Sequence, residues 1–205
     1  MKIHFHEGDL PGGVDFGKSV AIDTETLGLN PLRDALCLAQ LSGGDGHCHV
    51  VRLDRKSYKA PNLVRLLEDP DVVKIFHYAR FDVAVFQRYL NVSTSPVWCT
   101  KLASRLVRTY TDKHGLKDLV KELLDVDLSK QQQSSDWGAA KLSDAQLAYA
   151  ASDVLHLHKL KNMLEAMLVR EGRLDLALKC FGFIGTRAAL DLQGWSEEDI
   201  FAHQG

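Results

Sequence analysis

The stretch from Val20 to Thr26 constrains the fold of this chain more than any other. It begins with an apolar run, which is typical of a strand buried in a sheet, and the run leads into two acids, Asp23 and Glu25. Because alternate side chains of a strand lie on one face, both carboxylates would point the same way. Such a pair could bind a divalent cation through oxygen, or could simply face solvent at a strand end. Acids from elsewhere in the chain decide between these readings.

Length, composition and charge set the class of protein. The 205 residues fit one domain, or one domain with a modest extension, and a 45 % hydrophobic fraction is enough for a sizeable core. The net charge of −2 excludes a global basic field, so a nucleic-acid partner must be bound locally or be short. The N-terminus lacks an apolar signal core, no stretch reaches membrane-spanning length, and the four cysteines lack metal-site spacing. We therefore expect a cytoplasmic protein without a membrane partner.

Periodicity and turn residues predict strands first and helices later. Strands are expected over Lys2–Phe5, Lys18–Thr24, Leu36–Leu41, His49–Leu53 and Val72–Phe76. Helices are expected over Pro61–Leu67, Phe81–Leu90, from Thr100 onward, from a cap at Ser143 toward Val169, and over Leu174–Phe183. The glycine-rich segment 42–46 suits a hairpin. The sum predicts an α/β fold, with a mixed central sheet flanked by helices and a helical C-terminal part.

Two further acids lie at positions from which they could join Asp23 and Glu25 in a metal site. Asp82 lies where a predicted strand ends and a helix begins, and Asp153 lies in an apolar helical stretch. Tyr149 precedes Asp153 by four residues, so both side chains leave the same helical face. Taken singly, Asp82 could cap its helix and Asp153 could face solvent.

The acids and Tyr149 together form three motifs in a fixed order, Asp23 to Glu25, His77 to Asp82 and Tyr149 to Asp153. These motifs resemble the tyrosine branch of the DEDD exonuclease superfamily over most of the chain. The resemblance implies a ribonuclease H-like fold in which the four acids bind two Mg²⁺ or Mn²⁺ ions and Tyr149 orients the attacking water. Independent chemistry agrees, because four crowded carboxylates would repel one another without cations unless some stayed protonated.

Longer stretches are similar to two families within that superfamily. Residues 23–26 and 135–153 resemble ribonuclease D, although the helical C-terminal modules of ribonuclease D have no counterpart after Asp153. With residues 108–116, 130–137 and 192–201 included, the chain resembles nano-RNase C along its length. That resemblance implies hydrolysis of diribonucleotides such as pGpG, and of other very short RNAs, to nucleoside 5′-monophosphates. It also implies a ring-like homo-oligomer, octameric in that family.

Candidate substrate-binding residues fall into three groups. Leu27 could wedge against a base or be an ordinary core leucine, and His77 could bond water at the metal site or cap a strand. A cap that binds a terminal 5′ phosphate would reject long RNA, and its candidates are Arg108, Lys113, His114, Lys130, Gln132, Ser134 and Ser135. Positions in or beside the matched motifs add Thr24, Thr26, Phe81 and Trp137.

We expect residues 1–170 to form the 3′–5′ exonuclease domain and residues 171–205 to form a helical extension of it. The extension carries apolar residues that could contact another subunit or pack on the core of its own domain. The favoured function is metal-dependent 3′–5′ exoribonuclease action on very short RNA. A ribonuclease D-like enzyme that trims longer RNA or DNA ends, and a catalytically silent RNA-binding scaffold, are the alternatives. A polymerase proofreading module is a further alternative that would require a partner chain. Substrate length separates the first two, and the presence of all five site residues argues against the third.

Overall fold

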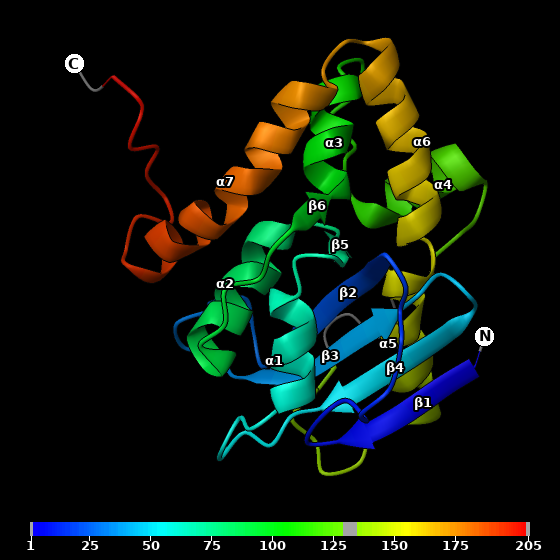
Figure 1. Cartoon of the computed structure of the whole chain (residues 1–205), viewed down its shortest axis with the longest axis vertical. Coiled ribbons are helices and arrows are strands. Elements are labelled where there is room, and N and C mark those ends of the chain that lie inside the picture. The colour runs from blue at the N-terminus through cyan, green and yellow to red at the C-terminus, as the bar shows by residue number, and fades with distance from the viewer. Residues whose placement is uncertain (1, 129–134, 204–205) are drawn as a thin grey trace.

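The computed structural model describes residues 2–128 and 135–203. Within these residues one sheet has the strand order β1-β4-β3-β2-β5-β6 (Figure 1). Its strands are β1 (Lys2–Glu7), β2 (Ser19–Thr26), β3 (Leu36–Ser42), β4 (His47–Arg52), β5 (Val73–Phe76) and β6 (Val97–Cys99). β3 is antiparallel to both β2 and β4, whereas the other neighbouring pairs are parallel. The sheet is therefore mixed, as predicted.

The apolar run before Asp23 places β2 in the middle of this sheet. Val20, Ala21 and Ile22 are completely buried, which is what a strand covered on both faces requires. The predicted hairpin joins β3 to β4, and Gly44 and Gly46 adopt positive φ angles of 82° and 85° that glycine accommodates without steric cost. Burial of β2 means that its acids emerge inside the protein rather than at a solvated edge.

Seven helices surround the described part of the sheet. They are α1 (Pro61–Glu68), α2 (Ala79–Leu90), α3 (Thr100–Val107), α4 (Leu116–Leu124), α5 (Asp144–Leu155), α6 (Leu157–Arg170) and α7 (Leu174–Leu192). In the view of Figure 1, α5 lies behind the sheet, α1 and α2 lie in front, and α3, α6 and α7 gather above it. The sheet is thus a layer between helices, with α5 facing β2, β3 and β4.

The expected long helix toward Val169 is two helices. It begins as predicted, because Ser143 and Gln146 form a reciprocal capping box. It breaks at His156, where the backbone (φ −100°, ψ −9°) ends α5 and begins α6. The short strand β6 was not predicted, and α7 extends nine residues beyond the expected end at Phe183.

The C-terminal helix α7 packs along α2 and α3. Phe181, Ile184 and Ala188 form part of the core, while Leu176 and Leu178 are half exposed. The segment therefore both packs back on the domain and presents apolar surface, and the division near residue 170 stays a prediction. Among the helices that the structure describes, none combines the length and the apolar character needed to cross a membrane.

Candidate active site

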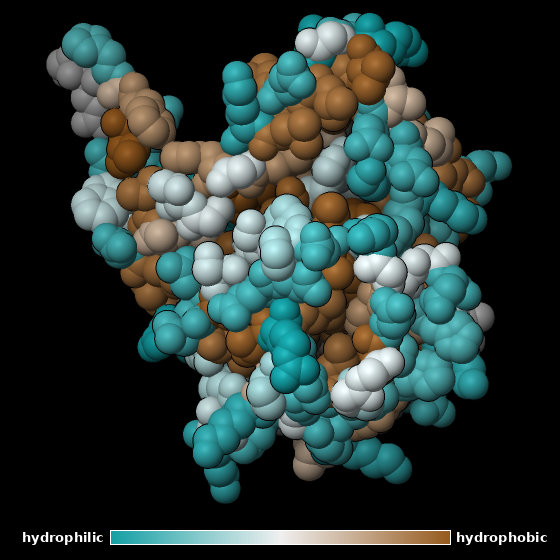
Figure 2. All heavy atoms as spheres, viewed as in Figure 1, coloured by the Kyte–Doolittle hydropathy of each residue, from teal (hydrophilic) through white to brown (hydrophobic). Residues whose placement is uncertain are grey.

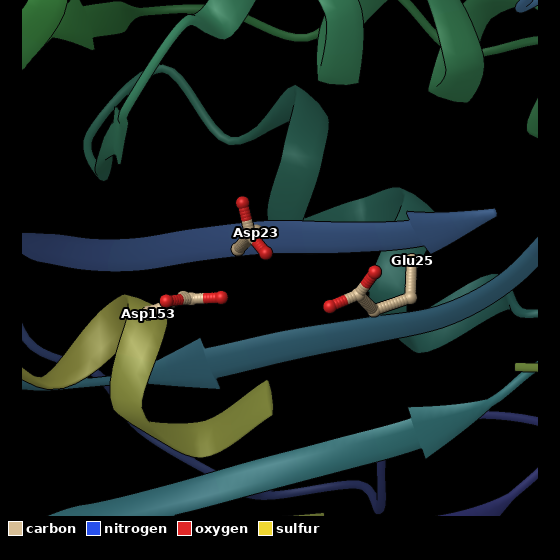
Figure 3. Close-up of side chains that lie close together, drawn as sticks. All are labelled: Asp23, Glu25 and Asp153. Atoms are coloured by element: carbon tan, nitrogen blue, oxygen red, sulfur yellow. The ribbon is translucent and has the colours of Figure 1, made fainter. Parts of the chain in front are cut away.

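Three carboxylates converge between β2 and α5. Asp23 and Glu25 occupy alternate positions of β2, and Asp153 comes from α5. One oxygen of each lies within 4.8 Å of the others. Figure 3 shows the carboxylates of Glu25 and Asp153 extending toward each other, with Asp23 beside them on β2. The period-two spacing on the strand and a helix packed over the sheet bring distant residues to one point.

The fourth acid, Asp82, lies beside this group. It belongs to the first turn of α2 and is only 3 % exposed. Its Oδ1 accepts a hydrogen bond of 2.7 Å from the hydroxyl of Thr24, which stands between Asp23 and Glu25 on β2. Thr24, predicted to bind substrate, is thereby buried and holds Asp82 in place. The charge of Asp82 still raises the pKa of both Asp23 and Glu25.

Burial and mutual repulsion keep protons on this cluster. Burial, followed by the charges of Asp82 and Asp153, raises the pKa of Asp23 well above its usual range. Burial and the charge of Asp153 raise the pKa of Glu25 to about 9. Burial raises the pKa values of Asp82 and Asp153 to about 7. A divalent cation would compensate four acids crowded in this way, and an all-oxygen donor set fits a hard ion such as Mg²⁺.

Tyr149 joins the cluster from one turn before Asp153 on α5. Its hydroxyl favours the ionised form of Asp153 and so lowers the pKa of that acid against the effect of burial. Burial and the neighbouring acids raise the pKa of Tyr149 itself, so the phenol keeps its proton and acts as a donor. Trp137 packs against the Tyr149 ring with 6.0 Å between centroids and is only 3 % exposed. Trp137 therefore supports Tyr149, and a direct contact of its ring with substrate stays a prediction.

Arg108, predicted to bind a terminal phosphate, is bonded inside the fold, and its role toward substrate stays a prediction. Its guanidinium is completely buried and donates to Glu122, to Ser104 Oγ at 3.0 Å and to the backbone oxygen of Lys113 at 2.7 Å. These acceptors, all within the fold, occupy the N–H groups of the guanidinium. Arg108 thus fixes the loop that carries Lys113, whose own side chain is exposed.

His77 and His114 are both bonded to the scaffold. His77 Nδ1 lies 2.9 Å from Thr100 Oγ1, and burial lowers the pKa of its ring to about 3, so it is neutral. His114 Nδ1 lies 2.8 Å from the hydroxyl of Ser104. A role for either ring in substrate binding stays a prediction.

The other substrate candidates lie in different environments. Leu27 is 49 % exposed just past β2, where a base could reach it. Thr26 donates its hydroxyl to the backbone oxygen of Gly28, and half-buried Phe81 lines a cavity of about 390 Å³. Ser135 is half-buried. Lys130, Gln132 and Ser134 lie outside the described residues.

Sequence reasoning missed the ion pairs that join α2 to α7. Asp191 of α7 accepts from Arg80 of α2 at 2.5 and 2.7 Å and from Arg187 at 2.7 and 3.0 Å. Asp191 is only 7 % exposed. An acid within an apolar helix is the signal that singled out Asp153, and applied to α7 it would have found Asp191.

This chain is similar to known exonucleases in sequence and in structure. A family model described as 3′-5′ exonuclease matches residues 14–169. The solved structures of NrnC from Brucella melitensis, one with bound Mg²⁺ and one bound to pGG, are each 56 % identical to this chain. Each comparison covers all of both chains with a TM-score of 0.96.

Ribonuclease D proteins match a shorter part. That of Gluconacetobacter diazotrophicus is 40 % identical over 156 residues, which are 76 % of this chain and 39 % of the relative. The structure of Escherichia coli RNase D is 26 % identical with a TM-score of 0.73, over 84 % of this chain and 45 % of that one. The chain thus spans about two fifths of the length of the curated relatives that it matches.

Proposed function

The chain belongs to the 3′–5′ exonuclease family, in the DEDD group that includes NrnC and ribonuclease D, and we propose that it hydrolyses diribonucleotides and other very short RNAs. Membership makes it an exoribonuclease, and the proposal concerns its substrate and its site. The convergence of Asp23, Glu25 and Asp153 on one point carries the assignment of the site. The full-length similarity to NrnC bound to pGG supports the choice of a short substrate, with nucleoside 5′-monophosphates as products.

We assign Asp23, Glu25, Asp82 and Asp153 as ligands for Mg²⁺ or Mn²⁺, with two ions per site. The donor set fits these ions, as the oxygen-only cluster and the raised pKa values indicate. Divalent cations bound there would supply Lewis-acid polarisation of the phosphate and a nucleophile at neutral pH. The near-neutral net charge agrees with a short substrate, because a long polyanion gains affinity from many basic contacts.

The protein's own groups position the reactants. Tyr149 keeps its proton and is held by Asp153 and Trp137, so its hydroxyl can hold a water beside the acids. Thr24 fixes Asp82 by a hydrogen bond. Leu27, exposed next to β2, would pack against a base of the substrate. Lys113, together with the segment around Ser135, is proposed to contact the terminal 5′ phosphate.

We also propose a homo-oligomer, an octamer by likeness to nano-RNase C. Figure 2 shows apolar side chains gathered over the upper part of the molecule, where α7 lies. The exposed apolar residues of α7 and the tail include Leu176, Leu178, Phe183 and Phe201. Apolar surface of this kind is typical of contacts between subunits.

Initial rates on 5′-labelled RNAs of increasing length, starting at two nucleotides and with Mg²⁺ or Mn²⁺ present, test the proposed substrate. We expect the rate to be highest on the dinucleotide and to fall steeply beyond it. Comparable rates at all lengths would indicate a ribonuclease D-like trimming enzyme. No cleavage at any length, from protein that still binds the RNAs, would indicate a binding scaffold.

A further inference from the structure

Among the residues that the structure describes, none forms a hydrogen bond with the buried side chain of Gln40. It lies in the middle of β3, is completely inaccessible, and neither its Oε1 nor its Nε2 is bonded among the described residues. A primary amide offers two N–H donors and an oxygen acceptor. Leaving all of them unsatisfied in a core is costly and rare, so a native protein that does so calls for an explanation.

The strand register places Gln40 beside the acid cluster. It pairs directly with Asp23 of β2 on one side and with Val50 of β4 on the other. Directly opposed residues of antiparallel strands share a face, with Cβ atoms about 5 Å apart. The side chains of Gln40 and Asp23 therefore leave the sheet together, on the face covered by α5.

The electrostatics of the next strand agree with this placement. Cys48 of β4 lies two residues from Val50 and so shares its face. Burial raises the pKa of the Cys48 thiol to about 12, and the charge of Asp23 adds to that rise. The charge of Asp23 on β2 therefore acts on Cys48 on β4, and β3 with Gln40 lies between these two strands.

Neighbours on this face outside the acid cluster offer the amide little. The fully buried side chains of α5, Ala150, Ala151 and Val154, have no polar atoms. The polar α5 side chains Tyr149 and Asp153 belong to the cluster around Asp23. Ser42, two residues along β3, already donates to the backbone oxygen of His47 at 2.7 Å. The carboxylate of Asp23 is the polar group that the register brings opposite Gln40.

We propose that Gln40 is a positioning residue for the metal site, and that its side-chain N–H donates to the carboxylate of Asp23 when Asp23 binds a divalent cation. A ligating carboxylate has a second oxygen, and a hydrogen bond to that oxygen fixes the orientation of the ligand. In the cation-free arrangement the amide stays unpaired. This inference depends on the metal role proposed for Asp23.

The test compares Gln40→Met with wild type, because methionine keeps the length of the side chain and removes its polar end. Thr94→Val is the matched control, since the Thr94 hydroxyl is also buried and unpartnered but lies between α2 and β6. Titration calorimetry measures the Mg²⁺ dissociation constant, and thermal melting with EDTA measures the stability of the cation-free protein. Both readouts are independent of catalysis.

We expect Gln40→Met to weaken Mg²⁺ binding about 10- to 100-fold while its melting temperature in EDTA stays equal or rises. Thr94→Val should leave the dissociation constant unchanged. An unchanged dissociation constant in Gln40→Met overturns the inference, and so does a large loss of cation-free stability, which marks a structural amide. If Gln40→Met folds poorly, the smaller Gln40→Leu replaces it, and failure of both to fold also counts as a structural role. Absence of Mg²⁺ binding by wild type contradicts the proposed function instead.

Discussion

At the scale of single residues, the site depends on acids that would be unfavourable anywhere else. Asp82 is nearly inaccessible, and Asp23, Glu25 and Asp153 crowd within 4.8 Å of one another. Buried like charges disfavour the ionised state, and the chain accepts that cost where a cation can remove it. Function therefore opposes stability at this point of the fold.

The protonated acids make the stability of the cation-free protein depend on pH. Their folded pKa values, about 7 for Asp82 and Asp153 and about 9 for Glu25, exceed the unfolded values near 4. The folded state then binds more protons than the unfolded state, so stability falls as pH rises through these values. Between pH 6.5 and 8 in EDTA, we expect the melting temperature to fall by roughly 5 °C.

Two opposing effects reduce this fall, and the cation supplies the control. Histidines whose pKa burial lowers, such as His77, oppose the fall near pH 6.5, because an unfolded histidine is still about half protonated there. Lys74, whose pKa burial lowers to about 8, opposes the fall near the upper end of the window. Saturating Mg²⁺ should remove most of the fall, and Asp153→Asn should reduce it. A melting temperature that rises with pH in EDTA would contradict the assigned protonation.

The Tyr149 hydroxyl should contribute to rate more than to folding. Tyr149→Phe keeps the ring against Trp137 but removes the donor that holds Asp153, so kcat should fall about 100-fold with little change in melting temperature. Tyr89→Phe is the control and should leave kcat unchanged, because the half-buried Tyr89 ring packs against Tyr58. Equal kcat values for wild type and Tyr149→Phe would remove this residue from the mechanism.

The sequence could predict the acids because each has a local signal. Asp23 and Glu25 follow from the two-residue period of a strand, and Asp153 follows from an acid in an apolar helix with Tyr149 one turn earlier. The burial of Arg108 could not be predicted because its acceptors lie on other segments. Nothing near it in the sequence shows that Glu122 of α4 pairs with its guanidinium inside the fold.

At the scale of elements, the ion pairs between α2 and α7 hold the helix that carries Asp82. Asp191→Asn leaves Arg80 and Arg187 without their carboxylate, and we expect a loss of about 2 kcal/mol in the free energy of unfolding. Asp125→Asn is the matched control, because the Lys121–Asp125 pair is exposed and should contribute less than about 0.5 kcal/mol. Chemical denaturation measures both. Similar small losses in the two variants would show that the Asp191 pairs do not brace α2.

Most elements could be predicted from periodicity, and the exceptions have physical reasons. β6 has three residues, too few to show a period, and it forms because β5 offers a parallel edge. The break at His156 has no glycine or proline to mark it, so an apolar pattern continuous through α5 and α6 looked like one helix. Packing against neighbouring elements therefore determines both the strand β6 and the break at His156.

At the scale of the whole molecule, the apolar surface of α7 is expected to be covered by other subunits. Light scattering coupled to size exclusion should give a mass near eight times the 22.9 kDa of one chain. Leu176→Glu with Leu178→Glu should reduce that mass while preserving the fold, because both side chains are half exposed in the monomer. A monomer peak for wild type would contradict the proposed assembly.

Hydrolysis of a 5′-labelled diribonucleotide at pH 8, by wild type and by Glu25→Gln, tests most directly whether the acid cluster is a metal-dependent nuclease site. With Mg²⁺, wild type should release nucleoside 5′-monophosphates, and EDTA should abolish the reaction. Glu25→Gln, which keeps the shape but removes a ligand charge, should lower the rate by on the order of 1,000-fold or more. A wild-type rate that persists in EDTA, or a Glu25→Gln rate close to wild type, would contradict the account.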